Sequence, residues 1–326
     1  MSNSFRRNKN LLLLAVVAVS ILITQFESSF NAYYFQIIIY IGINVILASS
    51  LNLINGFTGQ FSLGHAGFMA IGAYTAAVIT SNLGATSGAM GTLIFLMALI
   101  TAGLVASFFG LLVGIPSLRL KGDYLAIVTL GFGEIIRVII QNLDFLGGAR
   151  GFTGIPKLTN FFWVFAVVAV LLYLMSNLIR STYGKGFLAV RDDEVAAEAM
   201  GINSTHYKVV AFVAGAFFAG IAGGLYAHFV TYINPSQFSF VKSIEIVVMV
   251  IIGGMGHNIG VFISAVLLTV LPEALRPIAE YRMVIYSLAL VVIMISRPQG
   301  LFGNGEIFNK IWRMISKRPK VNESQT

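Results

Sequence analysis

Residues 244–272 read IEIVVMVIIGGMGHNIGVFISAVLLTVLP, an apolar run that the glycine-rich stretch GGMGHNIG at 253–260 divides into two pieces. Long apolar runs form helices that span membranes, because lipid offers the backbone polar groups no water with which to hydrogen-bond. A broken helix survives at membrane depth only where it is buried in protein or lines a cavity. The stretch therefore predicts an integral membrane protein with a broken or re-entrant element. A single kinked helix is the alternative.

The composition of the 326 residues agrees with this prediction. Hydrophobic residues make up 57% of the chain and charged residues only 10%, whereas a soluble globular protein has about 25% charged residues. This balance excludes an ordinary soluble enzyme, a disordered chain and a nucleic-acid-binding protein. The net charge of +8 is assigned to cytoplasmic loops. The chain has no cysteine, so it forms no disulfide and offers no thiolate to a metal.

Other apolar segments are expected to form membrane helices as well, because each resembles a spanning helix in composition. They lie at 11–24, 35–54, 62–80, 91–115, 124–141, 161–179, 207–230 and 283–297. The expected fold class is therefore all-α, a polytopic integral membrane protein with about nine or ten transmembrane segments.

The Lys and Arg residues predict the topology, because cytoplasmic loops carry an excess of them. They gather at the N-terminus, beside Arg119, in the loop 180–208 and in the tail 304–326. All four regions are cytoplasmic if 244–272 forms two short pieces that return to the same side of the membrane. A single crossing would place the tail outside, so charge and glycine positions independently predict the break. Both termini are therefore expected in the cytoplasm.

The first apolar run, 11–24, follows a basic N-terminus, as the apolar part of a signal peptide would. The residues after it, Thr24 to Glu27, offer no small-x-small cleavage pattern. We therefore expect a retained first span. At the other end, 304–326 is expected to be an amphipathic tail on the cytoplasmic membrane surface.

A second glycine-rich interruption, Asn55-Gly56-Phe57-Thr58-Gly59, lies in the first half of the chain. Paired interruptions in the two halves of a transporter point to its pathway. Candidate pathway residues in the two breaks are Gly56, Gly59, His65, Gly253 and Gly254. The pairing also suggests an internal repeat of 35–142 and 207–297, although the two halves share little sequence identity. For His65, ordinary packing is the alternative to a role in the pathway.

Charged residues inside a membrane segment are rare and often functional. Glu134 lies eleven residues into the segment that begins at Asp123, which places it about 16 Å along a helix. Arg137 is three residues further and can pair with it on one face. The pair is expected either to line the pathway or gate, or to join helices as a structural ion pair. A second pair, Lys242 and Glu245, is expected at the outer interface.

The longest cytoplasmic loop contains a short helix with recognisable ends. Asp192 is expected to cap its N-terminus, Gly201 to supply the left-handed residue after it, and Ser204 to cap the next span. A capped helix held between two membrane helices is shaped to fit a groove on another protein. A solvated connector is the alternative.

The segment RDDEVAAEAMGI, residues 191–202, resembles the coupling loop of the permease subunits of branched-chain amino-acid ABC importers. Further motifs agree with that family in the same order along the chain. They are GFTGQFSLGHAGF (56–68) with GAY (72–74), GDY (122–124) with TLGFGEI (129–135), GIP (154–156) and RPQGL (297–301). The resemblance covers residues 35–303. The extra first span and the long loop resemble the M-type subunit rather than its H-type partner.

The resemblance implies one transmembrane permease domain, residues 1–303, in a bacterial inner membrane. Its expected partners are an H-type permease, two cytoplasmic ATPase subunits and a periplasmic or lipid-anchored substrate-binding protein. The expected activity is inward movement of leucine, isoleucine or valine by alternating access. The loop 184–204 would couple this movement to the ATPases, through residues spread along it. These are Gly184, Arg191, Asp192, Glu194, Ala197 and Gly201.

The chain is not expected to be an enzyme. It contains no G-x-x-x-x-G-K-[ST] motif, so ATP and Mg²⁺ would be bound by the ATPase subunits, with no cofactor on this chain. No histidine pair has the H-E-x-x-H metal spacing. Two alternatives stay open, namely a permease for urea or short amides, and a proton-coupled transporter or intramembrane enzyme that uses Glu134.

Overall fold

The computed structural model describes residues 31–85, 88–117, 122–278, 280–296 and 300, together with Ser20 and Thr24. The predicted first span and the predicted tail lie outside these residues, apart from Ser20 and Thr24. The long helices, in chain order, are α2 (Ala32–Asn52), α3 (His65–Asn82), α4 (Ala89–Ser117), α5 (Asp123–Asn142), α6 (Phe161–Arg180), α9 (Ser204–Val230), α10 (Phe240–Gly253), α11 (Asn258–Ala274) and α12 (Arg282–Ser296). The shorter elements are the π-helix η2 (Leu53–Phe57), the helices α7 (Thr182–Asp192) and α8 (Glu194–Ala199), and the 3-10 turns η3 (Asp144–Leu146), η4 (Gly148–Arg150), η5 (Pro235–Phe238) and η6 (Arg276–Ile278).

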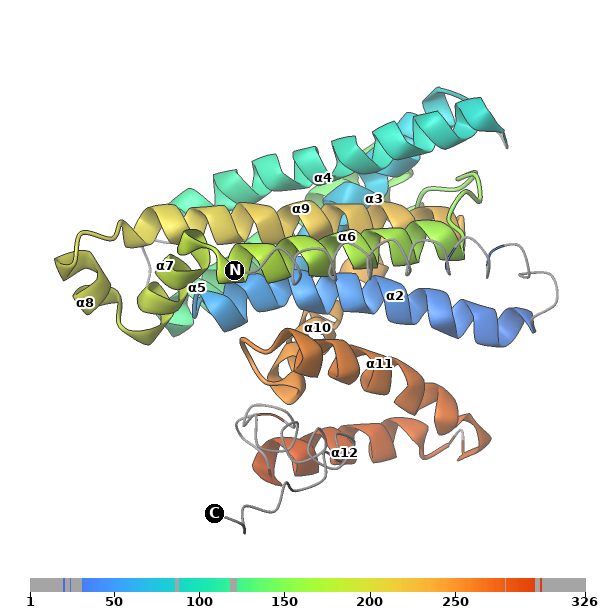
Figure 1. Cartoon of the computed structure of the whole chain (residues 1–326). Coiled ribbons are helices and arrows are strands. Elements are labelled where there is room, and N and C mark those ends of the chain that lie inside the picture. Colours follow the sequence, from blue (N-terminus) through green and yellow to red (C-terminus); the bar gives the residue numbers. More distant parts are fainter. Residues whose placement is uncertain are drawn as a thin grey trace, which may run out of the picture.

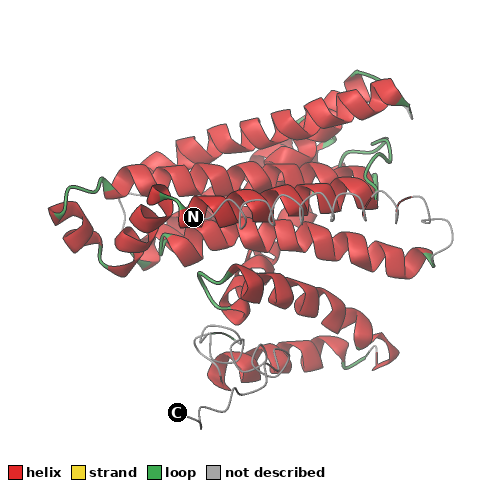
Figure 2. Ribbon diagram, in the orientation of Figure 1, coloured by secondary structure: helices red, strands yellow, loops and turns green. Residues whose placement is uncertain are grey.

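The described residues confirm an all-α membrane fold (Figures 1 and 2). Six of their helices are long and apolar enough to cross a membrane, and α11 and α12 are shorter apolar helices. The only β pairing among the described residues is an isolated bridge between Phe152 and Ile233. Most of the long helices run side by side, and α7 and α8 lie together at one end of the bundle (Figure 1). We call this end the α8 end.

Helix α3 is buried along most of its length and packs against both α4 and α9, which also pack against each other. Small residues allow helices to approach closely in lipid. A Cβ atom added to Gly72 on α3 would lie 2.1 Å from the carbonyl oxygen of Gly220 on α9, so the two backbones touch there. A Cβ on Gly220 would in turn lie 2.6 Å from the carbonyl oxygen of Ala102 on α4. Small residues thus bring α3, α4 and α9 close together inside this chain.

The predicted break in 244–272 is confirmed. The chain leaves α10 at Gly253, turns through Gly254 and Gly256 with φ of 91° and 84°, and starts α11 at Asn258. Only glycine adopts such positive φ values readily. A Cβ on Gly253 would lie 2.5 Å from the Cα atom of Val261, so α10 and α11 pack closely beside the turn. A single kinked helix is excluded.

Polar contacts fix α11 antiparallel to α2. Three hydrogen bonds follow one another along the two helices in opposite sequence order. They join Asn52 to Asn258 (3.2 Å), Asn44 to Thr269 (2.9 Å) and Tyr33 to Glu273 (2.5 Å). The turn between α10 and α11 therefore lies where α2 ends. This register places the two glycine-rich breaks next to each other.

Candidate functional site

The N-terminus of the short helix α8 is capped by the side chain of the residue that precedes it. The side chain of Asp193 accepts hydrogen bonds from the backbone N–H groups of Val195 (2.9 Å) and Ala196 (3.0 Å). The prediction that Asp192 caps this helix is wrong by one residue. Helix α7 continues through Asp192, and the backbone becomes extended only at Asp193, with φ −157° and ψ 108°. Gly201 has φ 82°, as predicted for the residue after the helix.

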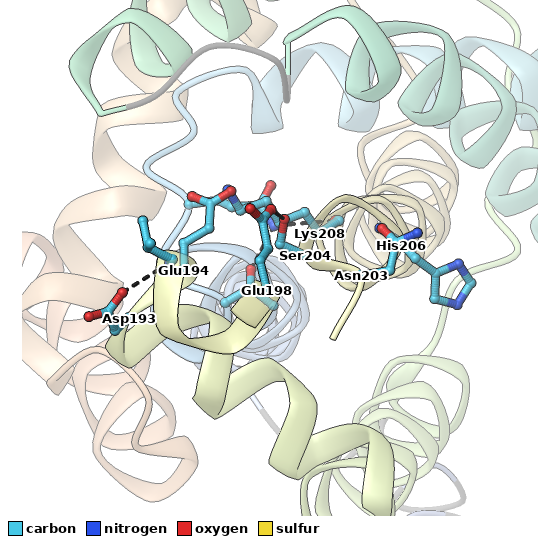
Figure 3. Close-up of polar contacts among 10 residues, drawn as sticks. Asp193, Glu194, Glu198, Asn203, Ser204, His206 and Lys208 are labelled. Carbon is cyan, nitrogen blue, oxygen red and sulfur yellow. Dashed lines mark hydrogen bonds and ion pairs between the residues drawn. The ribbon is translucent and has the colours of Figure 1, made fainter. Parts of the chain in front are cut away.

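Two side-chain contacts tie α8 to the first turns of α9 (Figure 3). The Glu194 carboxylate lies 2.7 Å from Nζ of Lys208, and their side chains are only 25% and 11% exposed. The hydroxyl of Ser204 donates a hydrogen bond to Glu198. The predicted cap of the next span is also displaced by one residue, because Asn203 accepts from the N–H of His206 at 3.0 Å and Ser204 is already helical. Helix α8 is therefore a fixed projection of the bundle.

The outer surface of α8 includes exposed apolar side chains. Val195 is 70% exposed and Met200, directly after the helix, is 83% exposed, whereas Ala197 is 4% exposed and faces the protein. Of the other residues predicted to act in coupling, Gly184 is buried, and a Cβ there would lie 1.9 Å from the carbonyl oxygen of Ile179. The structure thus places the predicted coupling residues at the α8 end of the bundle, where the side chains of Val195 and Met200 are exposed.

The two glycine-rich breaks meet at the α8 end. A Cβ on Gly56 would lie 2.2 Å from the backbone nitrogen of Gly256, and that nitrogen donates to Oδ1 of Asn52 at 2.8 Å. Helix α2 with its π-helical end runs for 26 residues, about 39 Å, so Gly56 lies at the far end of a full span. Among the predicted pathway residues, Gly56, Gly253 and Gly254 are buried and Gly59 is exposed. Asn52 was not among the site residues predicted from the sequence. Its position, as a polar residue just before a glycine break, was the signal that could have identified it.

His65 stands in the first turn of α3 and is completely buried. Its Nε2 lies 2.9 Å from Oγ of Ser50, which itself donates to the carbonyl of Leu47. Among the described residues, its Nδ1 has no hydrogen-bond partner. Next to it, Ser243 on α10 accepts from the backbone N–H of Ala66 at 3.1 Å. His65 therefore lies inside the protein, where α2, α3 and α10 converge.

Glu134 connects α5 to the beginning of α10. Its Oε2 lies 2.7 Å from Nε of Arg137, and its Oε1 accepts from the backbone N–H of Phe240 at 3.0 Å. The two charged side chains are 31% and 25% exposed. The ion pair expected from spacing is confirmed, and it has the additional task of capping α10.

Lys242, which is expected at the outer interface, is held by two side chains. Its Nζ contacts Glu245 at 3.0 Å and also Oδ1 of Asn44, which lies near the middle of α2, at 3.3 Å. Lys242 therefore joins the first turns of α10 to α2. In the part of the chain that the structure describes, no group of three or more His, Asp or Glu residues could hold a metal ion.

These features define a class: a polytopic helical membrane protein with two joined glycine breaks and a projecting, capped helix. Comparison with known proteins identifies the family. The model of the family described as "Branched-chain amino acid transport system / permease component" matches residues 33–295. The chain therefore belongs to this family of ABC transport permeases.

Two relatives are named high-affinity branched-chain amino acid transport system permease protein LivM. The protein of Salmonella typhimurium is 38% identical and that of Escherichia coli 37% identical, each over 294 residues that cover 79% of this chain and 67% of the relative. The permease protein LivH of Escherichia coli is 24% identical, over 80% of this chain and 92% of its own length. The higher identity to LivM confirms the predicted M-type resemblance. No solved structure matches the chain significantly.

Proposed function

We propose that this chain is the M-type permease subunit of an importer that carries leucine, isoleucine or valine into the cytoplasm, and that α8 is its contact with an ATPase subunit. The observation that carries the coupling role is the form of α8. It is capped by Asp193, tied to α9 by the Glu194–Lys208 ion pair, and presents exposed Val195. A fixed helix with an exposed apolar side chain docks at a low cost in conformational entropy. Because it is rigid, it also transmits movement better than a mobile loop does.

The remaining partners of the proposed importer follow from this role. A second permease of the LivH type would complete the membrane domain, and a substrate-binding protein would deliver the amino acid from outside. ATP and Mg²⁺ would be bound by two ATPase subunits, since this chain has no phosphate-binding G-x-x-x-x-G-K-[ST] motif. Closure of the ATPases on ATP would move α8, and the bundle would alternate between outward and inward access.

The proposed orientation places the α8 end in the cytoplasm of a bacterial cell, at the inner membrane. Arg180, Lys185, Arg191 and Lys208 all belong to this end, and Lys and Arg concentrate in cytoplasmic loops. With α10 and α11 as two antiparallel pieces, the basic tail 304–326 would return to the same side. Both termini would then be cytoplasmic.

The proposed pathway runs along the surface where α5 and α10 meet. Glu134 is partly exposed there and Val241 is largely exposed. The buried residues Gly56, His65, Gly253 and Gly254 would act by allowing the break regions to repack, and exposed Gly59 lies at their cytoplasmic edge.

The test of this function is co-purification of a tagged chain with co-expressed ATPase subunits, followed by measurement of ATP hydrolysis in proteoliposomes. We expect ATPase subunits in the complex, and stimulation of hydrolysis by a binding protein loaded with leucine but not with urea. The double variant V195D/M200D should lose the ATPases. The control L83D alters an exposed side chain in the turn after α3 and should retain them. A complex without ATPases, or stimulation by urea alone, would overturn the proposal.

A further inference from the structure

Arg191, in the last turn of α7, lies against both glycine breaks at once. Its Nη1 donates a hydrogen bond to the carbonyl oxygen of Gly56 at 3.4 Å. A Cβ on Gly256 would lie 2.9 Å from the same Nη1, and a Cβ on Gly59 would lie 3.0 Å from Cγ of Arg191. The side chain therefore packs its aliphatic stem on the first break and brings its guanidinium between the first and the second.

The position of this guanidinium is fixed from the other side. Its Nε and Nη2 contact Oδ1 of Asp192 at 3.0 Å and 2.9 Å, and Nη1 is left to reach the breaks. An arginine can do this because its planar head carries five donors in a rigid arrangement. A lysine has one flexible ammonium group and could not hold both contacts at once.

The breaks are also joined to each other directly. Asn52, the last residue of α2, accepts the N–H of Gly256 and donates to the side chain of Asn258 at 3.2 Å. A displacement of Arg191 would therefore act on a unit that comprises the end of α2 and the turn between α10 and α11.

The link to α8 is short. Arg191 is separated from Glu194, the first residue of α8, by two residues, and one of these is the capping residue Asp193. A second connection runs from α8 through the Glu194–Lys208 ion pair to Gln60, whose Nε2 donates to the carbonyl of Lys208 at 3.2 Å. That second connection reaches only the first break, whereas Arg191 contacts both.

We propose that Arg191 is a positioning residue that transmits movement of α8 to the paired glycine breaks, and that its side chain acts inward on the membrane domain rather than outward on the ATPase. This inference rests on the proposed function. The two glycine breaks form the hinge, and Arg191 displaces this hinge through its contact with Gly56 and Gly256. Without the guanidinium, ATP hydrolysis would continue, but the glycine breaks would no longer change conformation in response to it.

The test uses the assembled importer in proteoliposomes, with R191M, R191K and the control K185M. Lys185 is an exposed basic residue of the same helix, for which the structure records no contact with either break. R191M keeps an apolar stem and removes the donors. We expect all three variants to bind the ATPases and hydrolyse ATP. The number of amino acids moved per ATP should fall about tenfold in R191M, a typical size for a coupling free energy between sites, less in R191K, and not at all in K185M.

A second measurement separates transmission from simple support of the fold. Met255 is exposed in the turn between α10 and α11, and the chain has no cysteine of its own, so M255C places one label at the second break. Labelling of M255C should differ between the ATP-bound and nucleotide-free importer, and R191M should abolish that difference while the thermal stability of the complex stays unchanged. Normal transport per ATP in R191M would overturn the inference. Loss of the bound ATPases in R191M would also overturn it, because Arg191 would then belong to the docking surface. If the unmodified chain bound no ATPase, the proposed function would fail instead.

Discussion

The carboxylate of Glu134 on α5 accepts the backbone N–H of Phe240, the first residue of α10, at 3.0 Å. The first N–H groups of a helix have no partner within the helix, and in a membrane no water replaces one. Helix α10 has only 14 residues and starts beside the middle of α5. Glu134 therefore supplies to α10 what an N-cap residue supplies to a helix in water, and Arg137 balances its charge.

This contact predicts a small effect for one substitution of Glu134 and a larger effect for another. E134Q keeps an acceptor oxygen for Phe240, so uptake should fall less than threefold. E134L removes the acceptor and leaves Arg137 without its partner, which costs about 1–3 kcal/mol for the unsatisfied group. Thermal unfolding in detergent and leucine uptake would measure the two effects. Abolition of uptake by E134Q in a stable protein would instead favour the alternative in which Glu134 carries a proton.

The ion pair between Glu194 and Lys208 predicts rescue by charge exchange. Both side chains are largely buried, and removal of one partner from such a pair leaves an uncompensated charge, at a cost of about 3–5 kcal/mol in a fully buried site. E194K and K208E should each release the ATPases and reduce uptake. The double variant E194K/K208E should recover a substantial part of both, because α8 is again tied to α9. Co-purification with the ATPases measures the outcome, and a double variant as defective as the singles would contradict it.

Several of these features could be predicted from the sequence because two independent signals agreed on them. The break at 253–260 follows both from its glycines and from the sidedness of Lys and Arg. The Glu134–Arg137 pair follows from a spacing of three residues in an apolar segment. In both cases the residues that produce the feature lie close together in the sequence. The structure adds the segment that packs against them, α2 for the break and α10 for the ion pair.

Other features depend on packing between distant segments. Asp192 and Asp193 are equally good caps in isolation, and the choice is made where α7 ends. The ring of Phe187 packs edge-on against Tyr207 at 5.7 Å, and a Cβ on Gly186 would lie 2.3 Å from the Tyr207 ring, so contact with α9 sets the position of α7. The role of Asn52 likewise appears only when Gly256, 204 residues later, is placed beside it.

Two glycines predict a contrast in stability. A Cβ on Gly72 would lie 2.1 Å from the Gly220 carbonyl oxygen, whereas a Cβ on Gly131 in α5 would meet nothing within 4 Å. G72A should force α3 and α9 apart and destabilise the protein by about 1–3 kcal/mol, the usual cost of overpacking. G131A should be neutral or stabilise its helix by up to about 1 kcal/mol. Thermal unfolding of the purified protein in one detergent compares them, and equal melting temperatures would refute the close packing of α3 on α9.

The topology can be tested with single cysteines, because the chain has none of its own. K185C in α7 and M255C in the turn after α10 lie at the α8 end, whereas L83C lies in the turn after α3 at the opposite end, and all three positions are exposed. A maleimide that cannot cross the membrane, added to intact spheroplasts, should label L83C and spare the other two. Inside-out vesicles should give the reverse. The result at M255C is decisive for the broken element, since a single crossing by 244–272 would place the turn within the lipid, where neither preparation would be labelled.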